Sequence, residues 1–274
     1  MTNTTLPQTI YHYTTREGLL GILRDRAMWA TKIHYLNDAS ELLRPLHIAE
    51  QVVANFEKSM EKETAEKRAL GEDIALHMSY DIEVNQHINI CVASFCEKKD
   101  LLSQWRAYGV SGLSYCIGFD REKLEKDVTQ YSFALNPCEY YNAIDYQHKV
   151  EEFITQIIKK SMNEKNNHPT FIDEFLKFAA QMKLDFFVEE KEWRIVSNRP
   201  LSFTDNKFDF RLGKTMVIPH YVLPLDLSSV VEIMVGPCPN PELAKDTLHG
   251  LVYKFNLNIN PGMVEVSTIP YRSF

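Results

Sequence analysis

Short clusters of aromatic and polar residues recur at distant points of this chain, each at the edge of a predicted strand or helix. They include Tyr11-His12-Tyr13-Thr14, Trp29-Ala30-Thr31, Ser94-Phe95-Cys96-Glu97 and Glu192-Trp193-Arg194. Side chains that gather at the ends of separate elements typically line a pocket. The clusters therefore predict a fold built around one site.

Strand and helix patterns alternate irregularly along the chain. We expect strands over 10–13, 27–34, 88–95, 113–119, 130–140, 193–197, 215–218, 230–235 and 263–269, from their β-branched, aromatic and apolar content. We expect helices after the Thr14-x-x-Glu17 capping box and over 100–107, 142–165, 170–187 and 241–255. The strands are too numerous for a helical bundle and too irregularly spaced for a βαβ series. The fold class is therefore α+β, with mixed, mainly antiparallel sheets and flanking helices.

One segment, residues 41–80, is rich in Glu, Lys and Ala and has no proline after Pro45. It predicts one long helix or a helical pair, and we interpret it as an insertion. The 274 residues, of which 45% are hydrophobic, suffice for one large core. We therefore expect a single domain over residues 1–274 that contains this helical insertion.

Composition narrows the function classes. The formal charge of −7 argues against general binding to the nucleic-acid backbone, because such binding needs clustered Lys and Arg side chains. The five cysteines form no C-x-x-C pair, which argues against structural zinc, and we expect no metal. No apolar run approaches the roughly 20 residues of a membrane span, and the polar N-terminus does not look like a signal peptide. We expect a cytoplasmic protein without a membrane partner.

Nine short motifs follow one another along nearly the whole chain: Tyr11-His12-Tyr13-Thr14, Leu20-Gly21-Ile22-Leu23, Trp29-Ala30-Thr31, Leu36-Asn37-Asp38, Leu102-Ser103-Gln104-Trp105, Cys116-Ile117-Gly118-Phe119-Asp120, Glu192-Trp193-Arg194, Gly236-Pro237 and Ile269-Pro270-Tyr271-Arg272. In these motifs and their order the chain resembles a bacterial family of unknown function, DUF2971. The resemblance gives a family but no activity.

A second resemblance, to the His-Tyr-Glu group of ADP-ribosyltransferases, rests on the order of elements. An opening strand carries a His, a second strand carries a hydroxyl residue followed by an aromatic, and a late Glu lies at a strand edge. The resemblance implies an ADP-ribosyltransferase-like core in which His12 binds the adenosine ribose of NAD, Tyr35 stacks on nicotinamide and Glu192 engages the nicotinamide ribose. Tyr13 and Trp29 are rivals for the stacking position, and Thr31 would position a ribose hydroxyl.

The chemistry explains why a carboxylate is needed. Loss of nicotinamide leaves an oxocarbenium-like centre, which a carboxylate near the ribose stabilises. Glu192 is the first catalytic candidate. Glu190 is the second, because in a strand it would share a side with Glu192 and with Arg194. The guanidinium of Arg194 could pair with a carboxylate or bind the pyrophosphate.

The resemblance implies an NAD-dependent ADP-ribosyltransferase or NAD glycohydrolase with NAD as substrate, an unidentified macromolecular acceptor, and a role as a toxin or anti-phage effector. The alternative is a non-catalytic module that binds a nucleotide or a protein. A hydrolase or RNA-end-processing enzyme is a third hypothesis.

Each candidate residue also has a structural interpretation. His12 would hydrogen-bond a core carbonyl, Glu189 to Arg194 would form a solvated strand edge, and Thr31 would fill a strand. Cys96 would be a nucleophile only with a base that the sequence does not identify.

Overall fold

The computed structural model describes residues 6–37, 40–108, 113–164 and 171–270. In these ranges, ten strands form one sheet and two others form a small parallel pair. The main sheet contains β1 (Thr9–Thr15), β2 (Ala27–Lys32), β3 (Cys91–Cys96), β4 (Ser114–Asp120), β5 (Phe133–Pro137), β8 (Glu192–Ser197), β9 (Phe208–Leu212), β10 (Val217–Pro224), β11 (Val230–Val235) and β12 (Val264–Val266). The pair is β6 (Glu139–Tyr141) and β7 (Met182–Leu184). The α-helices are α1 (Arg16–Asp25), α2 (Ser40–Ser59), α3 (Ala65–Glu83), α4 (Leu102–Tyr108), α5 (Arg121–Thr129), α6 (Ala143–Glu164), α7 (Phe171–Ala179) and α8 (Pro241–Lys254).

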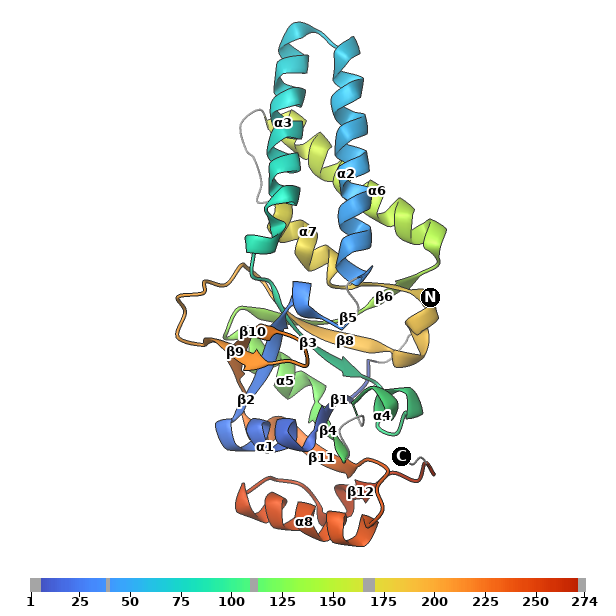
Figure 1. Cartoon of the computed structure of the whole chain (residues 1–274), viewed down its shortest axis with the longest axis vertical. Helices are drawn as coiled ribbons and strands as arrows, with labels where there is room; N and C mark the ends of the chain where they lie inside the picture. The colour runs from blue at the N-terminus through green and yellow to red at the C-terminus, as the bar shows by residue number, and fades with distance from the viewer. Residues whose placement is uncertain (1–5, 38–39, 109–112, 165–170, 271–274) are drawn as a thin grey trace.

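The main sheet divides at β3, near the middle of the molecule (Figure 1). One edge of β3 pairs with β8 from Val92 to Cys96. The other edge is shared, because β2 pairs only at Cys91 and Val92 and β1 pairs only at Cys96. One arm of the sheet therefore continues through β1, β4, β11 and β12, and the other continues through β2, β10 and β9. We call this division the fork.

Two large hydrophobic clusters lie on the sheet. The first lies beneath α1, α5 and α8 and contains Leu23, Leu124 and Leu248. The second joins α2, α3, α6 and α7 to β3 and β8, and includes Val92 and Val196. In Figure 1 the α2–α3 hairpin projects from the sheet beside α6 and α7, while α8 lies at the opposite end. A smaller cluster under α4 is centred on Trp105, whose side chain is fully buried.

The expected α+β class with a mainly antiparallel sheet is confirmed. Residues 41–80 form a helical pair, not one helix, with a short 3₁₀ segment (Met60–Lys62) between α2 and α3. Strands 88–95 and 215–218 are shifted in their bounds, since β3 begins at Cys91 and β10 extends from Val217 to Pro224.

Two expected elements were wrong, and one strand was missed. The strand expected over 130–140 is two strands in different sheets, β5 and β6. They separate after Pro137, and the next residue, Cys138, donates its backbone N–H to the carbonyl of Glu192. The helix expected over 170–187 ends at Ala179, where the chain turns into β7 and then into the 3₁₀ segment Asp185–Glu190. β9 was not predicted at all.

The capping box at the start of α1 was displaced by one residue. The cap is Thr15, whose hydroxyl accepts the backbone N–H of Gly18 at 3.2 Å, and Glu17 forms an ion pair with Arg16. Before α4, Asp100 accepts the indole N–H of Trp105 at 2.7 Å.

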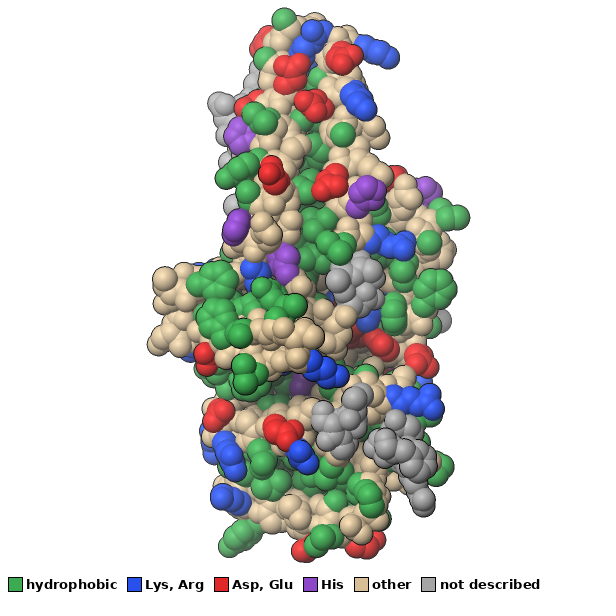
Figure 2. Space-filling model, in the orientation of Figure 1, with side chains coloured by type: hydrophobic (Ala, Val, Ile, Leu, Met, Phe, Trp, Pro, Cys, Tyr) green, Lys and Arg blue, Asp and Glu red, His purple; other side chains and the backbone are tan. Residues whose placement is uncertain are grey.

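The outer surface has a marked depression. In the orientation of Figure 1 the surface is hollowed across its middle, and hydrophobic side chains and a histidine are visible inside (Figure 2). Among the helices of the described ranges, none is both long enough and apolar enough to cross a membrane.

Candidate functional site

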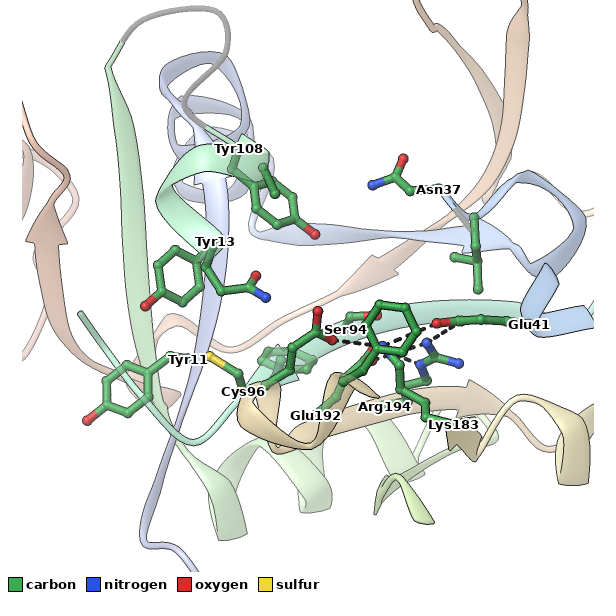
Figure 3. Close-up of a pocket in the computed structure, with 16 residues that line it drawn as sticks. Tyr11, Tyr13, Asn37, Glu41, Ser94, Cys96, Tyr108, Lys183, Glu192 and Arg194 are labelled. Carbon is green, nitrogen blue, oxygen red and sulfur yellow. Dashed lines mark hydrogen bonds and ion pairs between the residues drawn. The ribbon is translucent and has the colours of Figure 1, made fainter. Parts of the chain in front are cut away.

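A cavity of about 310 Å³ lies where β1, β3 and β8 meet α4 and the start of α2 (Figure 3). It is lined by Tyr11, Tyr13, Leu36, Asn37, Glu41, Ser94, Phe95, Cys96, Gln104, Ala107, Tyr108, Lys183, Phe187, Glu190, Glu192 and Arg194. Tyrosines gather on one side and charged side chains on the other, as Figure 3 shows. Residues from distant segments thus form one concave site, to which the clusters at Tyr11, Ser94 and Glu192 contribute, whereas Trp29-Ala30-Thr31 does not line it.

Five charged side chains form a network on the charged side of the cavity. Glu192 accepts hydrogen bonds from Arg194 Nε at 2.7 Å and from Lys183 Nζ at 2.6 Å. The guanidinium of Arg194 also donates to Glu41 at 2.6 Å, and Lys183 Nζ lies 2.7 Å from Glu190 and 3.2 Å from Glu41. The network joins α2 to β7 and β8, because each of these elements contributes at least one member.

Glu192 stays charged although its side chain is buried. Burial alone would raise the pKa of this carboxyl group, but the neighbouring charges of Arg194 and Lys183 outweigh it and lower the pKa to about 2. The same carboxylates raise the pKa values of Lys183 and Arg194, although burial opposes this. Glu192 is therefore ionised at neutral pH and does not act as a proton donor.

The two catalytic candidates differ in what they offer to a ligand. Both oxygens of Glu192 accept hydrogen bonds from Arg194 or Lys183, and its side chain is 7% exposed. Glu190 is 24% exposed, and within the described ranges only one of its oxygens has a partner, the ammonium of Lys183. The Glu190 carboxylate is therefore the one with a free oxygen at the cavity.

The expected strand geometry of these two residues was wrong. Glu190 ends a 3₁₀ segment, and Lys191 follows it with a positive φ of 41°, so that the chain turns before β8 begins at Glu192. The two carboxylates still converge, because both bind the ammonium of Lys183. The shared contact with Lys183, and not alternation along a strand, therefore brings the two carboxylates together. Lys183 was not selected from the sequence.

The aromatic side of the cavity is held in place by packing and hydrogen bonds. The Tyr13 hydroxyl donates to the carbonyl of Lys98 at 2.9 Å, and its ring packs edge-on against Trp105 with centroids 4.7 Å apart. Tyr108 stacks over Tyr13 at 6.5 Å, and in Figure 3 its hydroxyl points toward the open space of the cavity. Burial and the charges of Glu192 and Glu190 raise the pKa of Tyr108 to about 12, so that its hydroxyl stays a proton donor.

His12 lies outside this cavity. It alternates with Tyr11 and Tyr13 along β1, so its side chain projects from the other face of the strand, where its ring contacts Phe95. His12 Nδ1 lies 2.9 Å from the carbonyl of Ser94, inside the fork. Since a carbonyl can only accept, Nδ1 carries the proton, and burial lowers the pKa of the ring. The neutral ring therefore holds its unprotonated Nε2 as an acceptor.

Two other sequence candidates also lie away from the cavity. Thr31 is buried on β2, and its hydroxyl accepts a hydrogen bond from Arg211 at 3.1 Å. Tyr35 ends a 3₁₀ segment (Ile33–Tyr35) and is 36% exposed. The cavity therefore brings together Tyr13, Glu190, Glu192 and Arg194 of the sequence candidates, whereas His12, Thr31 and Tyr35 are not among its lining residues.

Cys96 lines the cavity but is not suited to nucleophilic chemistry. Burial raises the pKa of its thiol to about 12, and the sulfur donates to the carbonyl of Lys98 at 3.0 Å. A reactive cysteine needs a lowered pKa. Among the described residues, no group of three or more His, Cys, Asp or Glu side chains is arranged to hold a metal ion.

Sequence reasoning missed three lining residues, Glu41, Lys183 and Tyr108. Glu41 was assigned to the insertion over 41–80 and Lys183 to the helix expected over 170–187. Tyr108 follows the helix expected over 100–107 and was not selected. Asn37 faces the cavity across from Tyr108 in Figure 3, while its neighbour Asp38 is outside the described residues.

The family model DUF2971, described as a protein of unknown function, matches residues 104–195. The matched segment includes Lys183, Glu190, Glu192 and Arg194, whereas Tyr13 precedes it. No curated protein and no solved structure matches the chain. The similarity to this family is thus supported over about a third of the sequence and brings no activity with it. The resemblance to ADP-ribosyltransferases stays a prediction.

Proposed function

We propose that the cavity binds NAD and cleaves the bond between nicotinamide and ribose, as an ADP-ribosyltransferase or an NAD glycohydrolase. One observation carries the proposal. Three carboxylates, those of Glu41, Glu190 and Glu192, lie against only two cations, Lys183 and Arg194, so that the charged side of an aromatic pocket keeps one net negative charge. Nicotinamide in NAD is a cationic ring, and such a ring is attracted both to carboxylates and to tyrosine faces.

The same charge favours the reaction. When the glycosidic C–N bond breaks, its electron pair neutralises the pyridinium nitrogen and positive charge moves to the ribose ring. A carboxylate fixed beside that ring stabilises the developing charge without having to reorganise. Water or a nucleophile of the acceptor then attacks the ribose carbon and gives up a proton, which a carboxylate can accept.

The residues divide into two roles in this proposal. Glu190 is the catalytic carboxylate, because it is the more exposed of the two and keeps a free oxygen. Glu192 is a positioning residue that holds Lys183 and Arg194 beneath the site. Tyr13 and Tyr108 supply the aromatic wall, and the protonated hydroxyl of Tyr108 is a donor for a ribose oxygen or for the nicotinamide carboxamide.

The test is release of nicotinamide from NAD by the purified protein, with and without a host lysate as a source of acceptors. Glu190→Gln is expected to lower the rate by about 100-fold or more with an unchanged melting temperature. Glu192→Gln is expected to lower both the rate of nicotinamide release and the melting temperature, because it disturbs the ion pairs of two buried cations. Glu189→Gln, at an exposed neighbouring position, is the matched control and should behave as wild type.

Two results would contradict the proposal. Full activity in Glu190→Gln would remove this residue from the chemistry. NAD binding without turnover in every condition would replace the enzyme with a non-catalytic nucleotide-binding module. In that case the hydrogen bonds of Glu192 to Lys183 and Arg194, which occupy both of its oxygens, would support a structural role for this carboxylate in a binding module.

A further inference from the structure

Arg211 on β9 is a partly buried cation without a counter-charge. It lies on the face formed by β2, β10 and β9, where its Nη2 donates to the hydroxyl of Thr31 at 3.1 Å. Its Nε is buried and has no hydrogen-bond partner. In the described ranges, no carboxylate lies within ion-pair distance of its guanidinium, although the chain carries 37 acidic residues.

Such an arrangement is costly for a protein unless something else compensates it. Burial lowers the pKa of Arg211, because the charged form loses hydration that no neighbouring carboxylate replaces. By contrast, Arg194 is buried more deeply and is satisfied by Glu192, Glu41 and the carbonyl of Ala180. The charge of Arg211, whose side chain is half-buried, is therefore one that an anion from outside the chain would compensate.

The surroundings of Arg211 suit a ligand that is both anionic and aromatic. Its guanidinium lies 5.8 Å from the ring centroid of Trp29, a side chain that is 46% exposed. His220, which is buried, packs against the same indole with centroids 4.7 Å apart and so holds it in place. A cation and an open indole face are groups that bind phosphates and bases.

The face is close to the cavity. Thr31, to which Arg211 donates, is paired with Val92 of β3, two residues before the cavity-lining Ser94. Within the cavity both cations, Lys183 and Arg194, are engaged by carboxylates, so that neither is free for a pyrophosphate. A dinucleotide held by Glu190 and Tyr108 would thus find its phosphate partner in Arg211.

We propose that Arg211, together with Trp29 and His220, forms an anion subsite that takes the pyrophosphate of NAD. This inference deepens the proposed function and rests on it, because it assigns another part of the same substrate. Arg211 supplies the charged hydrogen bonds, the indole of Trp29 lies against a base or ribose, and the buried ring of His220 supports that indole. Of the two partners considered for Arg194 from the sequence, a carboxylate and a pyrophosphate, the structure shows the carboxylates of Glu192 and Glu41.

The chain carries its own reporter for this subsite. Of its three tryptophans, Trp105 and Trp193 are 0% and 4% exposed, so Trp29 is the one that a ligand reaches. Titration of the full chain with inorganic pyrophosphate, NAD or nicotinamide riboside, followed by tryptophan fluorescence, measures binding at Trp29. Trp29→Phe should abolish the signal.

Arg211→Gln is expected to raise the Kd for pyrophosphate and for NAD by about tenfold or more. The Kd for nicotinamide riboside, which has no phosphate, should be unchanged and is followed by calorimetry. Lys214→Gln removes an exposed cation from the same β9–β10 hairpin and serves as the control for net charge. The melting temperature of Arg211→Gln should stay the same or rise, because the variant removes a buried charge without a partner.

The subsite is overturned if wild type does not bind pyrophosphate, if Arg211→Gln binds it as wild type does, or if the variant melts lower and loses all three ligands together. The last result would make Arg211 a structural residue. Nicotinamide release unaffected by Arg211→Gln would overturn the subsite and leave the proposed function intact. Pyrophosphate bound through Arg211 without any nicotinamide release would overturn the proposed function and leave the anion subsite.

Discussion

At the scale of the residue, Glu192 shows how charge can be kept inside a protein. The carboxylate is 7% exposed, yet the charges of Lys183 and Arg194 keep it ionised, because each lies within hydrogen-bond distance of it. A group whose pKa is lowered on folding stabilises the folded state above its unfolded pKa. That stabilisation disappears as the pH falls toward the folded value.

The pKa of Glu192 predicts the acid sensitivity of the protein. The shift from a reference value of 4.5 to about 2 corresponds to about 3 kcal/mol of stability. This stability is present at neutral pH and should be lost as the pH falls from about 5 to about 2. Urea unfolding at about pH 7, 4 and 3 measures it.

In that experiment Glu192→Gln should show a shallower fall of the free energy of unfolding with pH than wild type. Glu189→Gln, at an exposed position, should follow the wild-type curve. Identical slopes for Glu192→Gln and wild type would mean that Glu192 is not held below its usual pKa.

At the scale of the element, the α2–α3 hairpin is part of the core. Its buried side chains, among them Leu46, Val53, Ile74 and Met78, belong to the same cluster as the apolar faces of α6 and α7. Its first turn also supplies Glu41 to the cavity. The hairpin therefore stabilises and completes the site, although its sequence resembles a removable insertion.

Replacement of residues 43–82 by a short Gly-Ser linker is expected to expose these apolar faces and prevent stable folding. Soluble yield, circular dichroism and binding of an apolar dye would measure the loss. Shortening only the tip, residues 58–66, is the control, because most side chains there are exposed. A folded protein without the hairpin would contradict its role in the core.

The same scale shows what sequence could and could not predict. The strands at β1, β4 and β11 and the helix α8 were predicted close to their observed bounds, because periodicity and caps are local signals. β7 was missed because the burial of Lys183 against Glu192 overrides the helical pattern of its segment. β9 had a usable alternation at Phe208, Phe210 and Leu212.

The candidate site was predicted in the same uneven way. Glu190, Glu192, Arg194 and Tyr13 were selected from local clusters and do line the cavity. The face of β1 to which His12 belongs depends on strand pairing, and the partners of Lys183 depend on contacts between distant segments. Neither the strand register nor these long-range contacts can be predicted from the local pattern of a single sequence.

At the scale of the whole molecule, the five cysteines report on global folding. All are free thiols, and four of them are buried. Burial raises the pKa of every one, to about 12 for Cys91 and Cys96. Thiolate is the reactive form, so the native protein should react slowly.

With a disulfide reagent near neutral pH, native protein is expected to show at most one accessible thiol, Cys238, the one that is half-buried. Unfolding in denaturant should expose all five. The rate at which the remaining thiols react in native buffer should match the rate of global unfolding measured by circular dichroism. Rapid reaction of Cys96 alone would instead indicate that the cavity opens locally.

The fork at β3 affects how the protein folds while it is synthesised on the ribosome. β3 is held on one edge by β8, and the bond from Cys91 to Ser197 joins positions 106 residues apart. At a synthesis rate of about 5–20 residues per second, roughly 5–20 s pass between the synthesis of β3 and that of β8, and this edge of β3 has no partner during that time. Throughout this interval the nascent chain presents one edge of an apolar strand without its β8 partner, and such an edge can pair with other chains.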